Sequence, residues 1–304
     1  MSRTPRCLLA AACFVLIGMG TALAAGGPTV DQILARYAKA RGGAEAWKGV
    51  QSMAWTGRIE PMSETAVPPT PFMMMFKRPN ATRFEVIAQG RRSVRIFNGE
   101  KGWKLRPTSQ GLPDISDYST EEVGSARDAA GLDGPLFDPK TKGITVEVQG
   151  VEAIEGHDAH RLKVTLPTGQ VQYHWIDAGT YLELKYDRET RDVQGRRHAT
   201  SVFYRNYKAV QGLVLPLTIE TGGAAGQGGT RMVIERIALN PALGEDAFRD
   251  PAERTPQHHG VIVKATVDPP TPTPTPAPAP TPAPAAPVSP AASPAPASGG
   301  GDAR

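Results

Sequence analysis

Histidine is the first residue type to consider for chemistry in this chain of 304 residues, because imidazole binds metals and transfers protons near neutral pH. His157 and His160 have the spacing of some metal-ligand pairs, but the surrounding alternation places them at the start of a strand, where their rings need not converge. No third ligand lies nearby in the sequence, and His258-His259 follows the last expected strand. The sequence therefore predicts neither a metal site nor a cofactor.

Motifs for nucleophilic catalysis and phosphate binding lead to a similar conclusion. The Gly-rich stretch 222–229 lies between two expected strands and precedes no helix, so we interpret it as a flexible hairpin loop. The chain has no Gly-x-Ser-x-Gly motif, and Asp187, Glu189 and Asp192 cluster with two arginines in a pattern typical of a solvated turn. We therefore expect a binding protein and not an enzyme.

Binding chemistry is concentrated in residues 72–79. Phe72-Met73-Met74-Met75-Phe76 is apolar without alternation, so both faces of this strand are apolar. Methionine is flexible and polarizable, which suits a surface that adapts to apolar ligands; the alternative is a strand buried on both faces. Pro79 marks the strand end, and the planar fork of Arg78 can bind a carbonyl or a phosphate; the alternative is a solvated strand-end charge.

Alternation with period two predicts the strands that must position these residues. Apolar and polar residues alternate in stretches such as 160–166 and 171–176, and short Gly-containing turns separate these stretches. We expect about eleven antiparallel strands between Ser52 and Leu239, interrupted by a helical or irregular insertion at 120–130. Because a sheet of this size twists and curls, the predicted fold is mainly β (α+β), a curved antiparallel sheet that forms an open half-barrel covered by a few helices.

The first helix is the clearest of the covering segments. Thr29 and Gln32 have the spacing of a capping box, and Gly42-Gly43 supplies the stop. Between them, four apolar residues fall on one helical face: Val30, Ile33, Leu34 and Tyr37. A short second turn is expected to carry Trp47 to the same surface.

Both ends of the chain differ in composition from the domain between them. A basic start and an apolar run that ends in Ala22-Leu23-Ala24 predict a cleaved signal peptide at 1–24; the alternatives are an uncleaved membrane anchor and a lipid-attachment cysteine at Cys13. Residues 269–304 consist almost wholly of Pro, Ala, Thr, Ser and Gly, which predicts a disordered tail. The folded domain is therefore expected at 25–268. Both cysteines lie in the signal peptide, so the mature chain has no thiol or disulfide.

The distribution of charge excludes one class of partner. The chain has 34 Lys and Arg against 30 Asp and Glu, and the basic residues are scattered among the acidic ones. Nucleic-acid binding requires a basic patch or stripe. We therefore expect no nucleic-acid partner, and we expect a monomer.

Several short motifs follow one another in a specific order between Pro28 and Pro251. They are the helix end at 40–43, Phe76-Lys77-Arg78-Pro79-Asn80 with Arg83-Phe84, the turn at 97–103, Gly134-Pro135-Leu136, the stretch 156–164, Trp175-Ile176-Asp177 with Tyr181-Leu182, and the stretch 207–216. In this order they resemble the outer-membrane lipoprotein carrier family (LolA-like) and its relatives, the outer-membrane lipoprotein-sorting proteins. The chain departs from a typical carrier in its length, in its 222–229 loop and in its Pro-rich tail.

The resemblance implies a periplasmic carrier of lipids or lipoproteins, with acyl chains held in a hydrophobic half-barrel cavity. In the family, an arginine of the Lys-Arg-Pro motif helps to set binding and release; Arg78 matches it and would contact the polar head group at the cavity mouth. Nine apolar side chains would line the cavity: Phe72, Met73, Met75, Phe84, Val86, Leu162, Val164, Trp175 and Leu184. The implied partners are the acyl chains, together with an inner-membrane loading complex or an outer-membrane receptor.

Two other functions fit the same half-barrel. An envelope sensor or regulatory module would change its affinity for a partner when loaded with ligand. A structural adaptor would act through the Pro-rich tail and would keep its function with the cavity blocked or filled by its own core.

Overall fold

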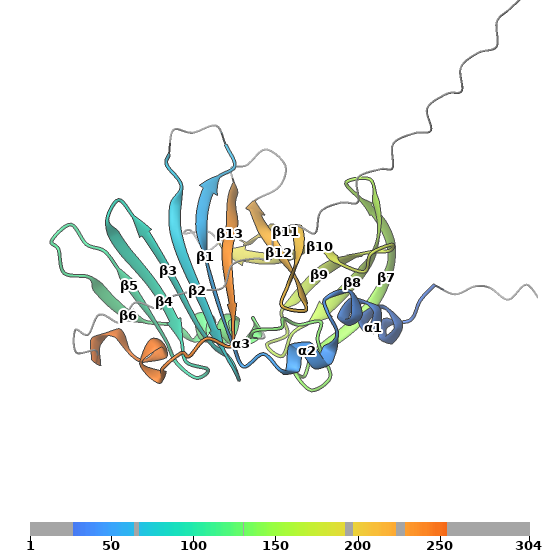
Figure 1. Ribbon diagram of the computed structural model, residues 1–304, viewed down its shortest axis with the longest axis horizontal. Coiled ribbons are helices and arrows are strands. Elements are labelled where there is room, and N and C mark those ends of the chain that lie inside the picture. Colours follow the sequence, from blue (N-terminus) through green and yellow to red (C-terminus); the bar gives the residue numbers. More distant parts are fainter. Residues whose placement is uncertain (1–26, 64–66, 130, 192–196, 223–228, 254–304) are drawn as a thin grey trace, which may run out of the picture. The chain divides into compact units, whose positions relative to one another are not determined.

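The computed structural model describes residues 27–63, 67–129, 131–191, 197–222 and 229–253 (Figure 1). All of them belong to the compact unit Met1–Asp268. The expected signal peptide, the Pro-rich tail, residues 223–228 of the Gly-rich loop and His258-His259 lie outside the described residues, so those interpretations stay predictions.

One antiparallel sheet of thirteen strands forms the framework of the described residues. The strands are β1 (Ser52–Pro61), β2 (Thr70–Lys77), β3 (Ala81–Ala88), β4 (Arg91–Phe97), β5 (Gly102–Arg106), β6 (Asp114–Asp117), β7 (Thr145–Ile154), β8 (His157–Thr165), β9 (Val171–Asp177), β10 (Glu183–Arg191), β11 (Arg197–Val210), β12 (Leu213–Gly222) and β13 (Gly229–Leu239). Their order in the sheet is β6-β5-β4-β3-β2-β1-β13-β12-β11-β10-β9-β8-β7. Because β6 and β7 do not pair, the sheet is an open half-barrel, as the sequence predicts.

Two meanders build this sheet and meet where β1 pairs with β13 (Figure 1). Strands β1 to β6 pair in chain order on one side of that junction, and β7 to β13 pair in chain order on the other. The chain between β6 and β7 must therefore connect the two edges of the sheet. This crossing segment contains α3 (Thr120–Asp128), where the sequence predicts a helical insertion, and residues 131–144.

The expected N-terminal helix is α1 (Val30–Ala40), and the predicted capping box between Thr29 and Gln32 is present. The chain then turns at Gly42, where φ is +105° and a Cβ atom would lie 2.3 Å from the carbonyl oxygen of Gly212. Only glycine tolerates both this backbone conformation and this close approach to the β11–β12 turn. The short helix α2 (Ala44–Lys48) follows and buries Trp47.

The two faces of the sheet have separate apolar cores. On the inner face, which we define as the face against which α1, α2 and residues 131–144 pack, one cluster joins side chains of both meanders to these segments. On the opposite, outer face, a smaller cluster lies over β1 to β5 and the end of β13 and includes Leu243 and Phe248. Phe248 ends the 3-10 helix η1 (Glu245–Phe248), which precedes η2 (Pro251–Glu253). The C-terminal described segment thus covers part of the outer face.

The structure has two strands more than the expected eleven. One strand that the sequence pattern does not indicate is β6, four residues with the sequence Asp-Ile-Ser-Asp. It pairs with β5 through backbone hydrogen bonds, with Ile115 opposite Leu105. Backbone pairing at a sheet edge does not require apolar alternation, so this strand leaves a weak signal in the sequence.

Candidate functional site

Along β12 and β1, the inner face of the sheet becomes less buried with distance from the helices. In β12, which starts beside the end of α1, Leu213, Leu215 and Leu217 are buried and Ile219 is half-buried. The other half-buried apolar side chains that pack against the inner cluster include Trp55, Ile59, Met74, Phe76, Phe84, Val86 and Met232. The helices therefore cover one end of these strands. At the other end Ile59, Met232 and Ile219, which are paired across β1, β13 and β12, are in partial contact with solvent.

Five of the nine side chains predicted to line one cavity belong to this inner face. They are Phe72, Phe84, Val86, Leu162 and Val164, all in or against the inner cluster. The strand register is consistent with this placement, because Phe72 pairs with Val86 and Met74 pairs with Phe84.

Met73 and Met75 lie on the outer face, in contrast to the expectation. Met75 pairs with Ala54 in β1, and both belong to the outer cluster, against which Met73 also packs. The strand is apolar on both faces, as predicted, but the two faces enter different cores. Met74, which alternation places between them, is the methionine of this run that faces inward.

Trp175 also lies outside the expected cavity, on the outer face of β9. Its indole nitrogen donates to Glu152 at 2.8 Å, and the Nζ atom of Lys185 lies 4.3 Å from its ring centroid. Cations that pack on an aromatic ring cover it without forming an apolar pocket. Leu184 is half-buried at the irregularity between Glu183 and Lys185 and belongs to neither cluster.

Arg78, just beyond the end of β2, uses its guanidinium group to join three segments. Its Nε atom donates to the carbonyl oxygen of Val50 at 2.9 Å. Its Nη2 atom donates to the carbonyl oxygen of Trp47 at 3.1 Å and to Oδ2 of Asp133 at 2.9 Å. The planar fork therefore connects the end of β2 to α2 and to the crossing segment.

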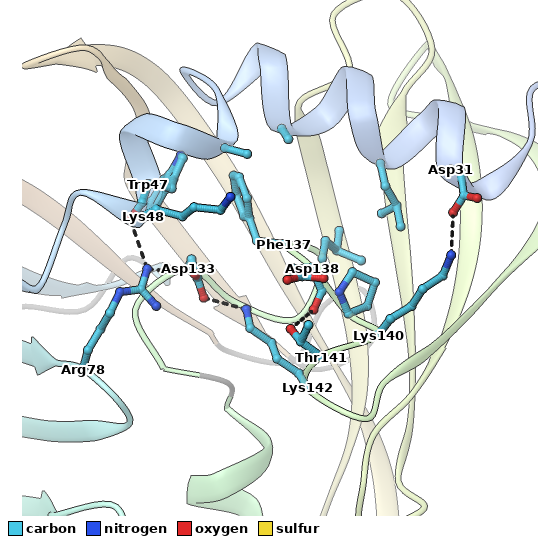
Figure 2. A pocket seen from close by; sticks show the side chains of 15 residues that line it. Asp31, Trp47, Lys48, Arg78, Asp133, Phe137, Asp138, Lys140, Thr141 and Lys142 are labelled. Atoms are coloured by element: carbon cyan, nitrogen blue, oxygen red, sulfur yellow. Dashed lines mark hydrogen bonds and ion pairs between the residues drawn. The ribbon is translucent and has the colours of Figure 1, made fainter.

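Asp133 contacts a second cation, as Figure 2 shows. Nζ of Lys142 donates to Oδ1 of Asp133 at 2.6 Å and to the carbonyl oxygen of Gly134 at 2.7 Å. The Asp133 side chain is 12% exposed. One carboxylate thus pairs with two cations, and this group of three side chains carries one net positive charge.

These side chains form part of the wall of a pocket of about 540 Å³ between α1, α2 and the crossing segment (Figure 2). Leu34, Ala38, Trp47, Leu136 and Phe137 supply its apolar surface. Its charged side chains are Lys48, Arg78, Lys140 and Lys142 with Asp31, Asp133 and Asp138. An apolar surface beside a small cation excess fits a ligand that has an apolar part and an anionic part.

Arg41 fixes the junction of the two helices to the sheet. Its Nε atom donates to the carbonyl oxygen of Val214 at 2.7 Å, and Nη1 donates to the hydroxyl of Tyr37 at 2.7 Å. The guanidinium lies 4.9 Å from the ring centroid of Trp47, whose indole nitrogen donates to the carbonyl oxygen of Arg41. Burial raises the pKa of the Tyr37 hydroxyl, which the nearby Arg41 lowers only in part, so this hydroxyl stays protonated.

His157 and His160, the spaced pair in the sequence, have different surroundings. Nδ1 of His157 lies 3.1 Å from the Asp177 carboxylate. His160 is buried, its Nε2 atom has no hydrogen-bond partner among the described residues, and its ring lies 5.8 Å from that of Tyr181. Burial, together with the charge of Arg36, lowers the pKa of His160. Within the described ranges, no three His, Cys, Asp or Glu side chains are grouped to hold a metal ion.

Two solved structures share this architecture. A LolA superfamily protein from Nitrosomonas europaea matches 73% of this chain and 98% of its own, with a TM-score of 0.50 and 16% sequence identity. This chain has the LolA-like fold. A DUF1329 family protein from Desulfovibrio piger matches 74% of this chain and 99% of its own, with a TM-score of 0.50 and 15% identity. No protein-family sequence model matches the chain, and no curated protein matches it by sequence.

No helix in the part of the chain that the structure describes is long and apolar enough to cross a membrane.

The residues of the site that the sequence pattern does not indicate are Asp133, Lys142 and Arg41. They lie in a loop and at a helix end, where no periodicity marks a functional side chain, and only their partners in space identify them.

Proposed function

We propose that this protein is a periplasmic carrier that holds the acyl chains of lipids or lipoproteins on the inner face of its half-barrel. The observation that carries the proposal is the set of half-buried apolar side chains at the end of this face that the helices leave uncovered. Burial of apolar surface contributes about 25 cal/mol per Å², so an acyl chain gains free energy when it covers these side chains.

Two further points support a carrier and not an enzyme. The fold is that of a LolA superfamily protein, and the motif order of the chain resembles that of outer-membrane lipoprotein carriers. The expected signal peptide directs such a protein to the periplasm, where hydrophobic acyl chains need a protein that shields them from water. A loading complex of the inner membrane or a receptor of the outer membrane is the partner that this function requires.

The pocket beneath the helices is the proposed site for the polar part of the ligand. Arg78 and Lys142 share one carboxylate there, so an incoming phosphate or carboxylate can replace Asp133 as their counterion. In this proposal Arg78 has two roles, because its bonds to the backbone of Trp47 and Val50 also hold α2 in place.

The decisive experiment is native mass spectrometry, with organic extraction, of protein isolated from a bacterial periplasm. We expect a stoichiometric adduct whose extract contains acyl chains. Protein that carries no adduct and takes up no fluorescent fatty acid in vitro would instead mean that the core is filled, which favours the adaptor function.

Two neighbouring methionines provide a matched pair of variants. Met74 and Met73 are both half-buried, but Met74 packs against the inner cluster and Met73 against the outer one. Glutamine has nearly the shape of methionine and adds a polar amide. Met74→Gln should weaken acyl-chain uptake several-fold, and Met73→Gln should leave it unchanged; equal effects of the two substitutions would argue against binding on the inner face.

A further inference from the structure

The indole N–H group of Trp55 is a polar donor without an acceptor in the apolar inner face. Trp55 lies in β1, pairs with Ile237 on one side and Met74 on the other, and packs edge-on against Phe76 with ring centroids 5.0 Å apart. Its Nε1 atom is shielded from solvent and has no hydrogen-bond partner among the residues that the structure describes.

Other indoles in the protein show how unusual this donor is. Nε1 of Trp47 donates to the carbonyl oxygen of Arg41 at 2.9 Å, and Nε1 of Trp175 donates to Glu152 at 2.8 Å. A buried indole N–H usually has such a partner, because an unpaired buried donor loses its bond to water without compensation. An unpaired donor in a native structure therefore calls for an explanation, such as a ligand that supplies the acceptor.

The surroundings of Trp55 define the chemistry of that acceptor. Its neighbours on the inner face are apolar, namely Met53, Met74, Phe76 and Ile237. A charged carboxylate at this position would lose its hydration with only one neutral donor in return. An ester or amide carbonyl is uncharged, accepts a hydrogen bond and continues directly into a hydrocarbon chain.

The donor can be reached from the uncovered part of the inner face. Met74, opposite Trp55 in β2, is half-buried, and its unbranched side chain moves at low cost. Farther along β1, Ile59 is also half-buried, so an acyl chain that starts at Trp55 finds apolar surface toward the open end of the face.

We infer that Trp55 recognises the carbonyl group of an acyl ester or amide, so that the ligand is an acylated lipid and not a simple hydrocarbon or ether lipid. This inference rests on the proposed function, because it names the ligand class for the same inner face. The glycerol esters of a phospholipid and the diacylglyceryl group of a lipoprotein share the required carbonyl.

A pair of lipids that differ only in this carbonyl tests the inference. The full chain is titrated with a diacyl phosphatidylglycerol and with its dialkyl ether analogue of equal chain length. One net hydrogen bond corresponds to roughly fivefold to tenfold in affinity, so the wild-type protein should bind the ester more tightly than the ether by about this factor.

Trp55→Phe should abolish this preference and bind both lipids as the wild-type protein binds the ether. Trp175→Phe is the matched control, because it removes an indole on the outer face and should leave the ester preference unchanged. A preference that survives in Trp55→Phe, or wild-type protein that binds ester and ether equally, would overturn the inference while leaving the proposed function intact. Failure to bind either lipid would overturn both.

A direct measurement on wild-type protein avoids dependence on the folding of a variant. The chain has four tryptophans, so a spectrum of protein labelled with ¹⁵N-tryptophan has four indole signals. The Trp55 indole proton should move downfield when the ester lipid binds and should not do so with the ether lipid. A triacylated lipopeptide added in a parallel titration should cause the same shift, and its affinity relative to the phospholipid distinguishes the two sources of the carbonyl.

Discussion

His174 and Glu183 form a buried contact on the inner face, with Nδ1 of the histidine 2.6 Å from Oε1 of the glutamate. The side chains are 3% and 7% exposed, and the histidine ring stacks on Tyr186 with a centroid distance of 5.2 Å. The hydroxyl of Tyr207 donates to the carbonyl oxygen of Glu183. This polar group connects β9, β10 and β11.

Removal of one partner of this pair should be costly. His174→Phe keeps an aromatic ring for the stack on Tyr186 but leaves the Glu183 carboxylate buried without its partner. We expect a loss of about 3–5 kcal/mol in the free energy of unfolding, measured by urea denaturation. The double variant His174→Phe/Glu183→Leu should lose less than the sum of the two single variants; strict additivity would show that the two side chains do not act as a pair.

Replacement of Arg78 should loosen the helices from the end of β2. Arg78→Met removes three hydrogen bonds that join β2, α2 and the crossing segment, and we expect a loss of about 1–3 kcal/mol in the free energy of unfolding. Arg78→Lys should recover only part of this, because an ammonium group cannot reproduce the planar fork. Lys48→Met is the control, since Lys48 is 68% exposed at the rim of the same pocket. Wild-type stability of Arg78→Met would mean that the three bonds hold no segment in place.

Removal of the shared carboxylate should make the pocket more attractive to anions. In Asp133→Asn, Arg78 and Lys142 keep their charges but lose their common counterion. We expect this variant to bind an anionic lipid more tightly than wild-type protein does, with little change for a zwitterionic lipid of the same chains, and we expect added salt to reduce the gain. An identical change for both lipids would argue against a head group in the pocket.

The buried His160 should make stability depend on pH. Its pKa is lowered by burial and by Arg36, while Asp177 acts in the opposite direction. Because the unfolded chain binds a proton more readily, the free energy of unfolding should fall as pH decreases through the ordinary histidine pKa of about 6.5 and on to the lower pKa of the folded state. At pH values well above 6.5, His160 is neutral in both the folded and the unfolded chain and does not lower the free energy of unfolding.

The comparison that isolates this group is His160→Phe against wild-type protein, by urea denaturation between pH 7.5 and 5.5. The variant should lose less stability on acidification, since its other histidines are unchanged. Parallel pH dependence of the two proteins would contradict the role assigned to His160.

Several elements could be predicted from the sequence because their causes are local. The capping box at Thr29 and Gln32 uses hydrogen bonds within one turn, and α1 begins where they predict. Apolar alternation predicts strands such as β8 because burial of one face of a strand leaves a period of two in its own residues. The insertion at 120–130 breaks this period, and α3 occupies it.

The site itself was decided by the tertiary structure. Exchanging the two faces of a strand leaves a pattern with period two unchanged. The sequence therefore could not tell that Met74 faces inward and Met73 outward. The pairing of β2 with its neighbours and the position of the helices decide this. Arg78 meets Asp133, and Trp55 remains without an acceptor, only because distant segments pack together. The sequence by itself determined most of the strands and helices, through local periodicity and capping, but not the edge strand β6. Only long-range packing determined which side of the sheet is the inner face and which polar groups on it remain without partners.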